Sequence, residues 1–143
     1  MFTNEAVHEV TRARIAQFAH AVGATHPAHF DPAAARALGH PDVIGPPTYP
    51  IVACLPVVTT ILDTLAVNPR TGLHLEQTFR YFRPIAAGDL LAVTATITAA
   101  RQIADNLILT LAMTVTSDGI TVTQVRTALL LRPTPTTTDV TST

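Results

Sequence analysis

The apolar and polar positions of the chain follow one pattern before a long apolar run and a different one after it. The run, Thr48–Val67, reads TYPIVACLPVVTTILDTLAV and is the longest nearly uncharged stretch of the sequence. Asp63 is its only ionisable side chain apart from Cys54 and Tyr49. A helix that is apolar on nearly all sides must be buried on nearly all sides. The pattern therefore predicts a central helix around which the rest of the chain is organised.

Three structures compete for this run. A transmembrane helix needs about 20 consecutive apolar residues, whereas the run contains four threonines, two prolines and Asp63. A signal peptide is excluded because the run lies in the middle of the chain. We favour a helix enclosed by a curved sheet, with Thr48 capping its start and Pro50 in its first turn. Pro56 is expected either to kink this helix or to mark its true beginning.

Before the run, the spacing of apolar residues predicts two shorter helices. The first covers residues 12–22, with Thr11 as its N-cap and Gly23 at its end. The second begins after Asp31, with a proline at its first position, and ends near Gly39. Extended or irregular segments are expected over residues 6–10, 24–30 and 40–47.

After the run, apolar and polar residues alternate with a period of two from Leu73 to Arg132, which predicts consecutive strands. Turn signals separate the strands at residues 84–89 and 117–119. An antiparallel sheet with one apolar face needs a cover, and the run at residues 48–67 is the element apolar enough to supply it. The predicted fold class is therefore α+β, with a curved antiparallel sheet wrapped around one long helix.

The composition limits the class of protein. With 143 residues, the chain is expected to form a single domain over residues 1–132, followed by a disordered Thr/Pro-rich tail over residues 133–143. The net charge of -1 offers no electrostatic case for nucleic acid or an anionic membrane as a partner. The single cysteine, Cys54, excludes an internal disulfide and has the apolar neighbours of a buried side chain. With no targeting segment recognised, the cytoplasm is the expected location.

Four stretches resemble the MaoC-type (R)-hydratase/dehydratase family, which has the hotdog fold. Residues 23–29, GATHPAH, resemble a loop that reads roughly Gly-Asp-x-Asn-Pro-x-His in that family. Residues 33–44 resemble the helix and connector that follow, and residues 45–49, GPPTY, resemble the entry to the central helix. Residues 77–89 resemble a strand and turn that end in Pro-x-x-x-Gly-Asp. The PPT form of the helix entry is closest to the FAS1-like branch, which includes mycobacterial 3-hydroxyacyl-ACP dehydratase subunits.

The resemblance implies chemistry on an acyl thioester and also shows where this chain departs from it. Hydration of an enoyl thioester needs a base, a group that holds the water and a donor for the thioester oxygen. The family histidine corresponds to His29, but the aspartate position is Ala24 and the asparagine position is His26. The glycine whose N–H serves as the donor corresponds to Pro47, which has no N–H. The N–H or hydroxyl of Thr48 remains as the candidate donor.

The candidate catalytic residues are therefore His29, His26 and Asp31. Asp31 lies two residues after His29 and could orient an imidazole, although it could instead simply cap the following helix. A His-x-x-His pair beside an aspartate also resembles a metal site, but Pro27 gives this loop no helical face, so no metal is expected. No cofactor is expected either. The candidate substrate-binding residues are Pro47, Thr48, Tyr49 and Phe82.

Three functions remain open at this point. The chain is a dehydratase or hydratase that uses His29 with a rebuilt partner group, or it is the substrate-binding, non-catalytic subunit of a heterodimeric dehydratase. The third hypothesis is a repurposed hotdog isomerase or cyclase of a polyketide-type pathway. The expected partners are an acyl thioester on acyl carrier protein or coenzyme A, and a second hotdog chain in a homodimer or heterodimer. Loss of the carboxylate at Ala24 favours the second and third hypotheses, whereas His29 favours the first and third.

Overall fold

The computed structural model describes residues 1–3 and 7–132. The N-terminal part contains β1 (Phe2–Thr3), β2 (His8–Glu9), α1 (Arg12–Val22), the 3₁₀ turn η1 (Pro27–His29) and α2 (Pro32–Ala37). The long helix α3 (Pro50–Thr64) and the 3₁₀ turn η2 (Pro69–Thr71) follow, and then come the strands β3 (Leu73–Tyr81), β4 (Leu90–Ile103), β5 (Asn106–Ser117) and β6 (Ile120–Leu131). The Thr/Pro-rich tail lies outside the described residues.

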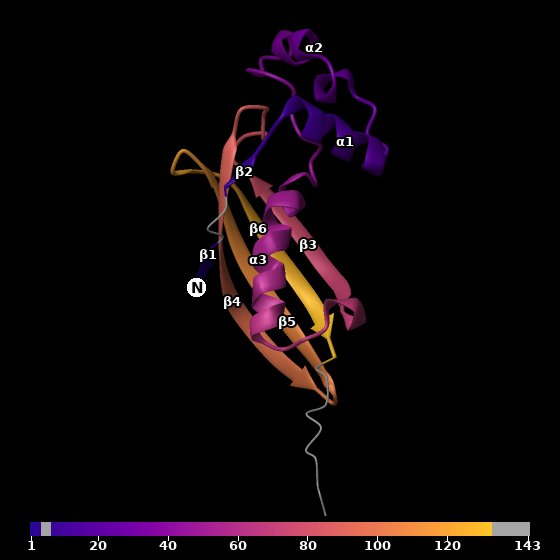
Figure 1. Cartoon of the computed structure of the whole chain (residues 1–143), viewed down its shortest axis with the longest axis vertical. Coiled ribbons are helices and arrows are strands. Elements are labelled where there is room, and N and C mark those ends of the chain that lie inside the picture. Colours follow the sequence, from indigo (N-terminus) through magenta and orange to yellow (C-terminus); the bar gives the residue numbers. More distant parts are fainter. Residues whose placement is uncertain (4–6, 133–143) are drawn as a thin grey trace, which may run out of the picture.

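The strands form one antiparallel sheet in the order β1-β4-β5-β6-β3, with β2 also paired to β4. The sheet curves around α3, and α1 and α2 lie together at one end of it (Figure 1). Short turns join β4 to β5 and β5 to β6, whereas β3 pairs with β6, so the connection from β3 to β4 crosses from one side of the sheet to the other. The prediction of an α+β hotdog fold is thus confirmed, including the helix over residues 12–22 and four long strands after Gly72.

The core lies between α3 and the concave face of the sheet. Ala53, Cys54, Val57 and Ile61 of α3 are buried there, and they belong to one hydrophobic cluster with the inward-facing residues of β4, β5 and β6. The period-2 alternation of the strands is what supplies this apolar face. Burial raises the pKa of the Cys54 thiol to about 12, so the thiol stays protonated and packs as a small apolar group.

The start of α3 differs from the sequence prediction. The helix begins at Pro50, and its N-cap position is Tyr49, whose side chain makes no capping hydrogen bond. The prediction that Thr48 caps the helix was therefore wrong. The reason is that the prolines at positions 46 and 47 lead into a tight turn, in which the Tyr49 N–H donates to the Pro46 carbonyl at 2.9 Å. The helix also does not begin near Pro56, which lies inside it with its ring on the exposed side.

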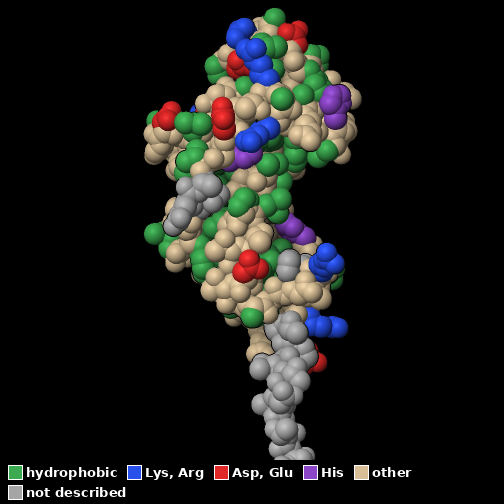
Figure 2. Space-filling model, viewed as in Figure 1, with side chains coloured by type: hydrophobic (Ala, Val, Ile, Leu, Met, Phe, Trp, Pro, Cys, Tyr) green, Lys and Arg blue, Asp and Glu red, His purple; other side chains and the backbone are tan. Residues whose placement is uncertain are grey.

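One side of α3 is not covered by the chain itself. Leu55 is 53% exposed, and the hydroxyls of Thr59, Thr60 and Thr64 on this side donate to helix carbonyls four residues earlier. Over α3, the face shown in Figure 2 carries hydrophobic side chains and few charged ones. The expectation of a helix buried on nearly all sides was therefore wrong: within this chain α3 is buried only on the face toward the sheet. Among the described residues, no helix is long and apolar enough to cross a membrane.

Polar groups define the ends of α1 and join α1 to the connector before α3. The Thr11 hydroxyl accepts from the Arg14 N–H at 3.1 Å as the N-cap of α1, and Gly23 ends the helix with φ at +72°. The Arg12 guanidinium donates two hydrogen bonds to the Asp42 carboxylate, from Nε and from Nη2, each 2.9 Å long, and they join α1 to the connector before α3. The neighbouring Arg12 lowers the pKa of Asp42 to about 2, so this pair is charged throughout the neutral range.

Truncating the buried face of α3 tests this architecture. We expect Ile61→Ala to lower the free energy of unfolding by about 2–5 kcal/mol, because the fully buried side chain leaves a cavity. The matched control is Thr60→Ala, one residue earlier on the exposed side, for which we expect a change within about 0.5 kcal/mol. Urea unfolding followed by circular dichroism measures both. Equal effects of the two substitutions would contradict the burial of Ile61.

Candidate active site

A cavity of about 360 Å³ lies at the start of α3, where the α1–α2 part meets the sheet. Its walls come from the loop around η1, from the connector before α3 and from the end of β3. The lining residues are His26, His29, Ile44, Gly45, Pro47, Tyr81 and Pro84. Three of these, His26, His29 and Pro47, are candidate site residues from the sequence. The cavity thus brings together two histidines in otherwise largely apolar surroundings.

His29 is held in one tautomer by the backbone. It is 8% exposed, and its Nδ1 lies 2.7 Å from the carbonyl oxygen of Ile44. A carbonyl oxygen can only accept, so Nδ1 carries a proton and donates it to this bond. In the neutral ring, Nε2 then has a free lone pair. The His29 ring is therefore oriented by Ile44, whose own N–H donates to the Ala28 carbonyl at 3.0 Å.

His26 is held in the complementary tautomer. Its Nδ1 accepts a hydrogen bond of 3.1 Å from the Ala28 N–H, so the side chain serves as the N-cap of η1. An accepting Nδ1 places the proton of the neutral ring on Nε2, which is a donor. The ring centroids of His26 and His29 are 6.1 Å apart. One cavity therefore offers a hydrogen-bond donor from His26 and an acceptor from His29.

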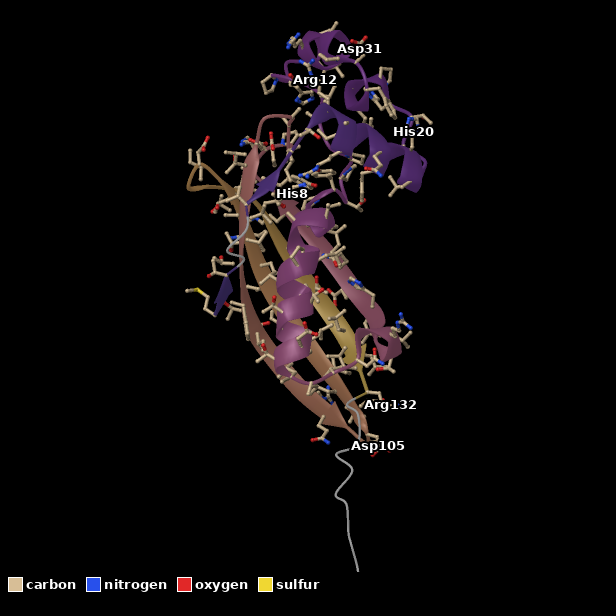
Figure 3. The ribbon with its side chains drawn as sticks, viewed as in Figure 1. His8, Arg12, His20, Asp31, Asp105 and Arg132 are labelled. Atoms are coloured by element: carbon tan, nitrogen blue, oxygen red, sulfur yellow. The ribbon has the colours of Figure 1, made fainter. Side chains whose placement is uncertain are left out.

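Asp31 lies outside this cavity. Its carboxylate accepts a hydrogen bond of 2.9 Å from the Ala33 N–H and caps α2. Figure 3 shows Asp31 at the outer end of the molecule, beside α2. The group that orients the His29 ring is the Ile44 carbonyl, as described above, so the structure does not bring Asp31 and His29 together as a pair. Ala24, the aspartate position of the family motif, leaves no carboxylate in its place.

The entry to α3 forms another wall of the cavity. Pro47 lines it, and the Pro47 carbonyl accepts a hydrogen bond from the hydroxyl of Tyr81. Thr48 follows and is exposed, and its N–H makes no backbone hydrogen bond within the described part of the chain. Thr48 is not among the residues that line the cavity, but it lies two residues before Pro50 and so places an N–H near the positive end of the α3 dipole.

Two candidate substrate-binding residues point elsewhere. The Tyr49 side chain is fully buried on the opposite side of the helix entry, and its hydroxyl lies 2.9 Å from Nε2 of His8. Phe82 is 55% exposed, with the Arg80 guanidinium 5.4 Å from its ring centroid. Neither side chain lines the cavity that contains His29.

Tyr81 is a cavity residue that the sequence-based selection missed. Burial raises the pKa of Tyr81 above its ordinary value, so the phenol stays neutral and acts as a hydrogen-bond donor. The alternation along β3 could have identified it, because Tyr81 shares the inward face with Phe79, whereas Phe82 falls on the other face. In the described residues, no cluster of three or more potential metal ligands occurs.

Comparison with known proteins identifies the family and agrees with the fold. The model of the family described as FAS1-like, dehydratase domain region, matches residues 2–125. A UPF0336 protein of Clavibacter michiganensis is 45% identical over 107 residues, which cover 71% of this chain and 69% of that protein. Among solved structures, the C-terminally truncated HadBC (3R-hydroxyacyl-ACP dehydratase) complex of Mycobacterium tuberculosis matches with a TM-score of 0.82 and 25% identity, covering 90% of this chain and 93% of that one. A MaoC-like dehydratase matches with a TM-score of 0.81 and 30% identity, covering 92% of this chain and 41% of that one.

The two histidine tautomers can be measured directly. In ¹⁵N-resolved NMR spectra at a pH where both rings are neutral, we expect His29 to be protonated at Nδ1 and His26 at Nε2. His74 on the exposed part of β3 serves as the reference for an imidazole without such bonds in the described structure. A neutral His29 ring with its proton on Nε2 would contradict the hydrogen bond from Nδ1 to the Ile44 carbonyl.

Proposed function

Because the chain belongs to the family of FAS1-like dehydratase-region proteins, we propose that it is a MaoC-like dehydratase or hydratase of acyl thioesters. The observation that carries this proposal is the His29 ring, whose Nδ1 is bonded to the Ile44 carbonyl and whose Nε2 is available as a base. The substrate class is a 3-hydroxyacyl thioester, or the enoyl thioester formed from it, on acyl carrier protein or coenzyme A.

The proposed reaction assigns one step to each polar group of the cavity. In the dehydration direction, Nε2 of His29 takes the proton from the α-carbon, and the hydroxyl leaves the β-carbon while Nε2–H of His26 donates a hydrogen bond to it. The leaving hydroxide takes up the proton that His29 removed, which gives water and the enoyl thioester. Hydration follows the same steps in reverse. His26 thus replaces the carboxylate that Ala24 lacks.

The thioester oxygen gains negative charge during this reaction and needs a donor. We assign this role to the N–H of Thr48, because it follows the cavity residue Pro47 and has no backbone partner in the described part of the chain. A free N–H at a helix start is suited to an oxyanion, since the helix dipole favours negative charge there. The N–H of Thr48 would then replace the N–H of the family's glycine, because Pro47 at that position has no N–H.

Removing the base tests the enzymatic proposal. We expect His29→Ala to lower kcat/KM for hydration of crotonyl-coenzyme A by about 10²–10⁴-fold, because the reaction loses its general base. His26→Ala should lower it by roughly 10-fold, as one hydrogen bond is lost. His20→Ala is the control, because this exposed side chain of α1 lies outside the cavity. Turnover by the wild-type protein that persists in His29→Ala would contradict the proposal.

The open edge of the sheet at β3 suggests a partner chain. The outer edge of β3 is unpaired within the described residues, and Leu73 and Leu75 near it are 60% and 52% exposed. The exposed Leu55 of α3 lines an adjoining groove together with Leu73. An open strand edge with apolar neighbours favours pairing with another chain. We propose that β3 pairs with a second hotdog chain, either a copy of this one or a related protein.

The alternative function uses the same pairing. If the related chain carries an Asp-His pair, this chain becomes the substrate-binding half of a heterodimeric dehydratase, which Ala24 and Pro47 favour. Turnover that appears only after the related chain is added, and that survives His29→Ala, would support this alternative. If both preparations are inert and bind long acyl chains, the repurposed isomerase or cyclase becomes the better hypothesis.

A charge on the β3 edge tests the pairing. We expect Leu75→Arg to shift the protein, alone or mixed with the related chain, from dimer to monomer in sedimentation velocity, because burying an unpaired charge in an interface is unfavourable. Ile120→Arg is the matched control, since Ile120 is 69% exposed at the turn between β5 and β6. A monomeric wild-type protein under both conditions would contradict pairing, as would equal effects of the two substitutions.

A further inference from the structure

A second cavity lies on the other side of the α3 entry, between α1, β2 and the first turn of α3. Its volume is about 500 Å³, and the hydrogen-bonded pair of His8 and Tyr49 lies at its base. Figure 3 shows His8 at the junction of β2, α1 and the upper end of α3. The cavity shares no lining residue with the one that contains His29. The reaction proposed above makes no use of it.

The polar groups around this cavity carry a positive charge. Arg14 and Gln17 of α1 lie at its rim, and no carboxylate is among the described residues that line it. Burial and the nearby Arg14 guanidinium both lower the pKa of His8, with burial the larger cause, so the imidazole is neutral in the neutral pH range. Arg14 is therefore the charge that determines which ligands the cavity favours.

The Arg14 guanidinium is held in place for this role. One of its amino groups, Nη1, donates a hydrogen bond of 2.7 Å to the backbone carbonyl of Glu9. This bond uses one N–H, and no described carboxylate lies within ion-pair distance of Arg14. The guanidinium has five N–H donors in a planar fork, which matches a carboxylate. Arg14 thus retains donors for an anion at the rim of the cavity.

The remaining walls are apolar and rigid. The ring of Phe18 packs edge-on against Tyr49 at a centroid distance of 5.4 Å, and Ala21 of α1 continues this wall. Tyr49 is fully buried, so the base of the cavity is fixed by the core. Ligand sites typically combine an apolar wall with a few polar groups that set the orientation of the ligand. Here the apolar wall lies beside one cation and a pair of neutral polar groups.

We propose that this cavity is a binding site for a small carboxylic acid with a flat apolar body. The carboxylate is bound by the Arg14 guanidinium, with Gln17 as a further donor at the rim. The apolar body lies against Phe18 and Ala21 above the His8–Tyr49 pair. This site is independent of the chemistry at His29, so it stands or falls separately from the proposed acyl-thioester reaction.

The test is an NMR titration of the full-length protein with benzoate. We expect saturable shifts at His8, Tyr49 and the cavity side of α1. Benzamide, which is neutral and has nearly the same shape, should bind at least about 10-fold more weakly, because it cannot form the charge-assisted bond to Arg14. Equal affinities, or no saturable shifts with benzoate, would overturn the proposal.

Two variants separate the charge from the shape of the cavity. Arg14→Gln should weaken benzoate binding at least about 10-fold, whereas Arg70→Gln, the same charge change at η2, should leave it unchanged. Ala21→Trp keeps the charge and fills the space, and it should also abolish binding. The amide spectrum of each variant shows whether it is folded.

Two results would assign the cavity to something else. Benzoate binding that survives both Arg14→Gln and Ala21→Trp in folded protein places the ligand elsewhere and overturns the proposal. Shifts at His8 and Tyr49 that depend on protein concentration without benzoate would assign the cavity to a side chain of a second copy, and they would overturn the small-molecule site as well.

Discussion

The hydrogen bonds of the connector Val43–Gly45 fix the positions of the η1 loop, the turn before β4 and the start of α3 relative to one another. The Ile44 N–H donates to Ala28 beside η1, and its carbonyl accepts from Nδ1 of His29. The Gly45 N–H donates to the Ile85 carbonyl, and the Val43 carbonyl accepts from the N–H of Ala87 in the turn before β4. One extended segment thus joins the loop that carries His29, the sheet and the start of α3. The position of the His29 ring depends on this segment more than on any side-chain pair.

Most of the fold could be predicted because the strong patterns in the sequence are local. Alternation marks the strands after Gly72, and Thr11 and Gly23 mark the ends of α1 through capping geometry that depends on near neighbours. The start of α3 was misplaced because Thr48 is a good N-cap in isolation. The two prolines before it lead into a turn instead, and the Tyr81 hydroxyl of a distant strand donates a hydrogen bond to that turn at the Pro47 carbonyl. A capping preference of about 1 kcal/mol is overruled by such tertiary contacts.

The site was predicted only in part, for a related reason. The loop motif identified His26 and His29, and both line the cavity. The tautomer of each ring, however, is determined by a backbone partner, which is the Ala28 N–H for His26 and the Ile44 carbonyl for His29. Backbone partners of this kind cannot be recognised from residue types. A search for a carboxylate therefore selected Asp31, which caps α2. The directions of Tyr49 and Phe82 depend on packing across elements, which sequence spacing does not specify.

Gly45 lies directly against Tyr49, and each of the two residues lines one of the two cavities. A Cβ on this residue would lie 2.9 Å from Cβ and Cγ of Tyr49, closer than side-chain atoms pack, so a side chain here would displace the tyrosine. Gly45 itself lines the cavity of His29, while Tyr49 forms the base of the other. The residue before it, Ile44, orients the His29 ring. A displacement of Tyr49 toward Gly45 would therefore also displace the neighbouring Ile44 carbonyl, which orients the His29 ring. Gly45 thus links the two cavities physically, although it has no side chain.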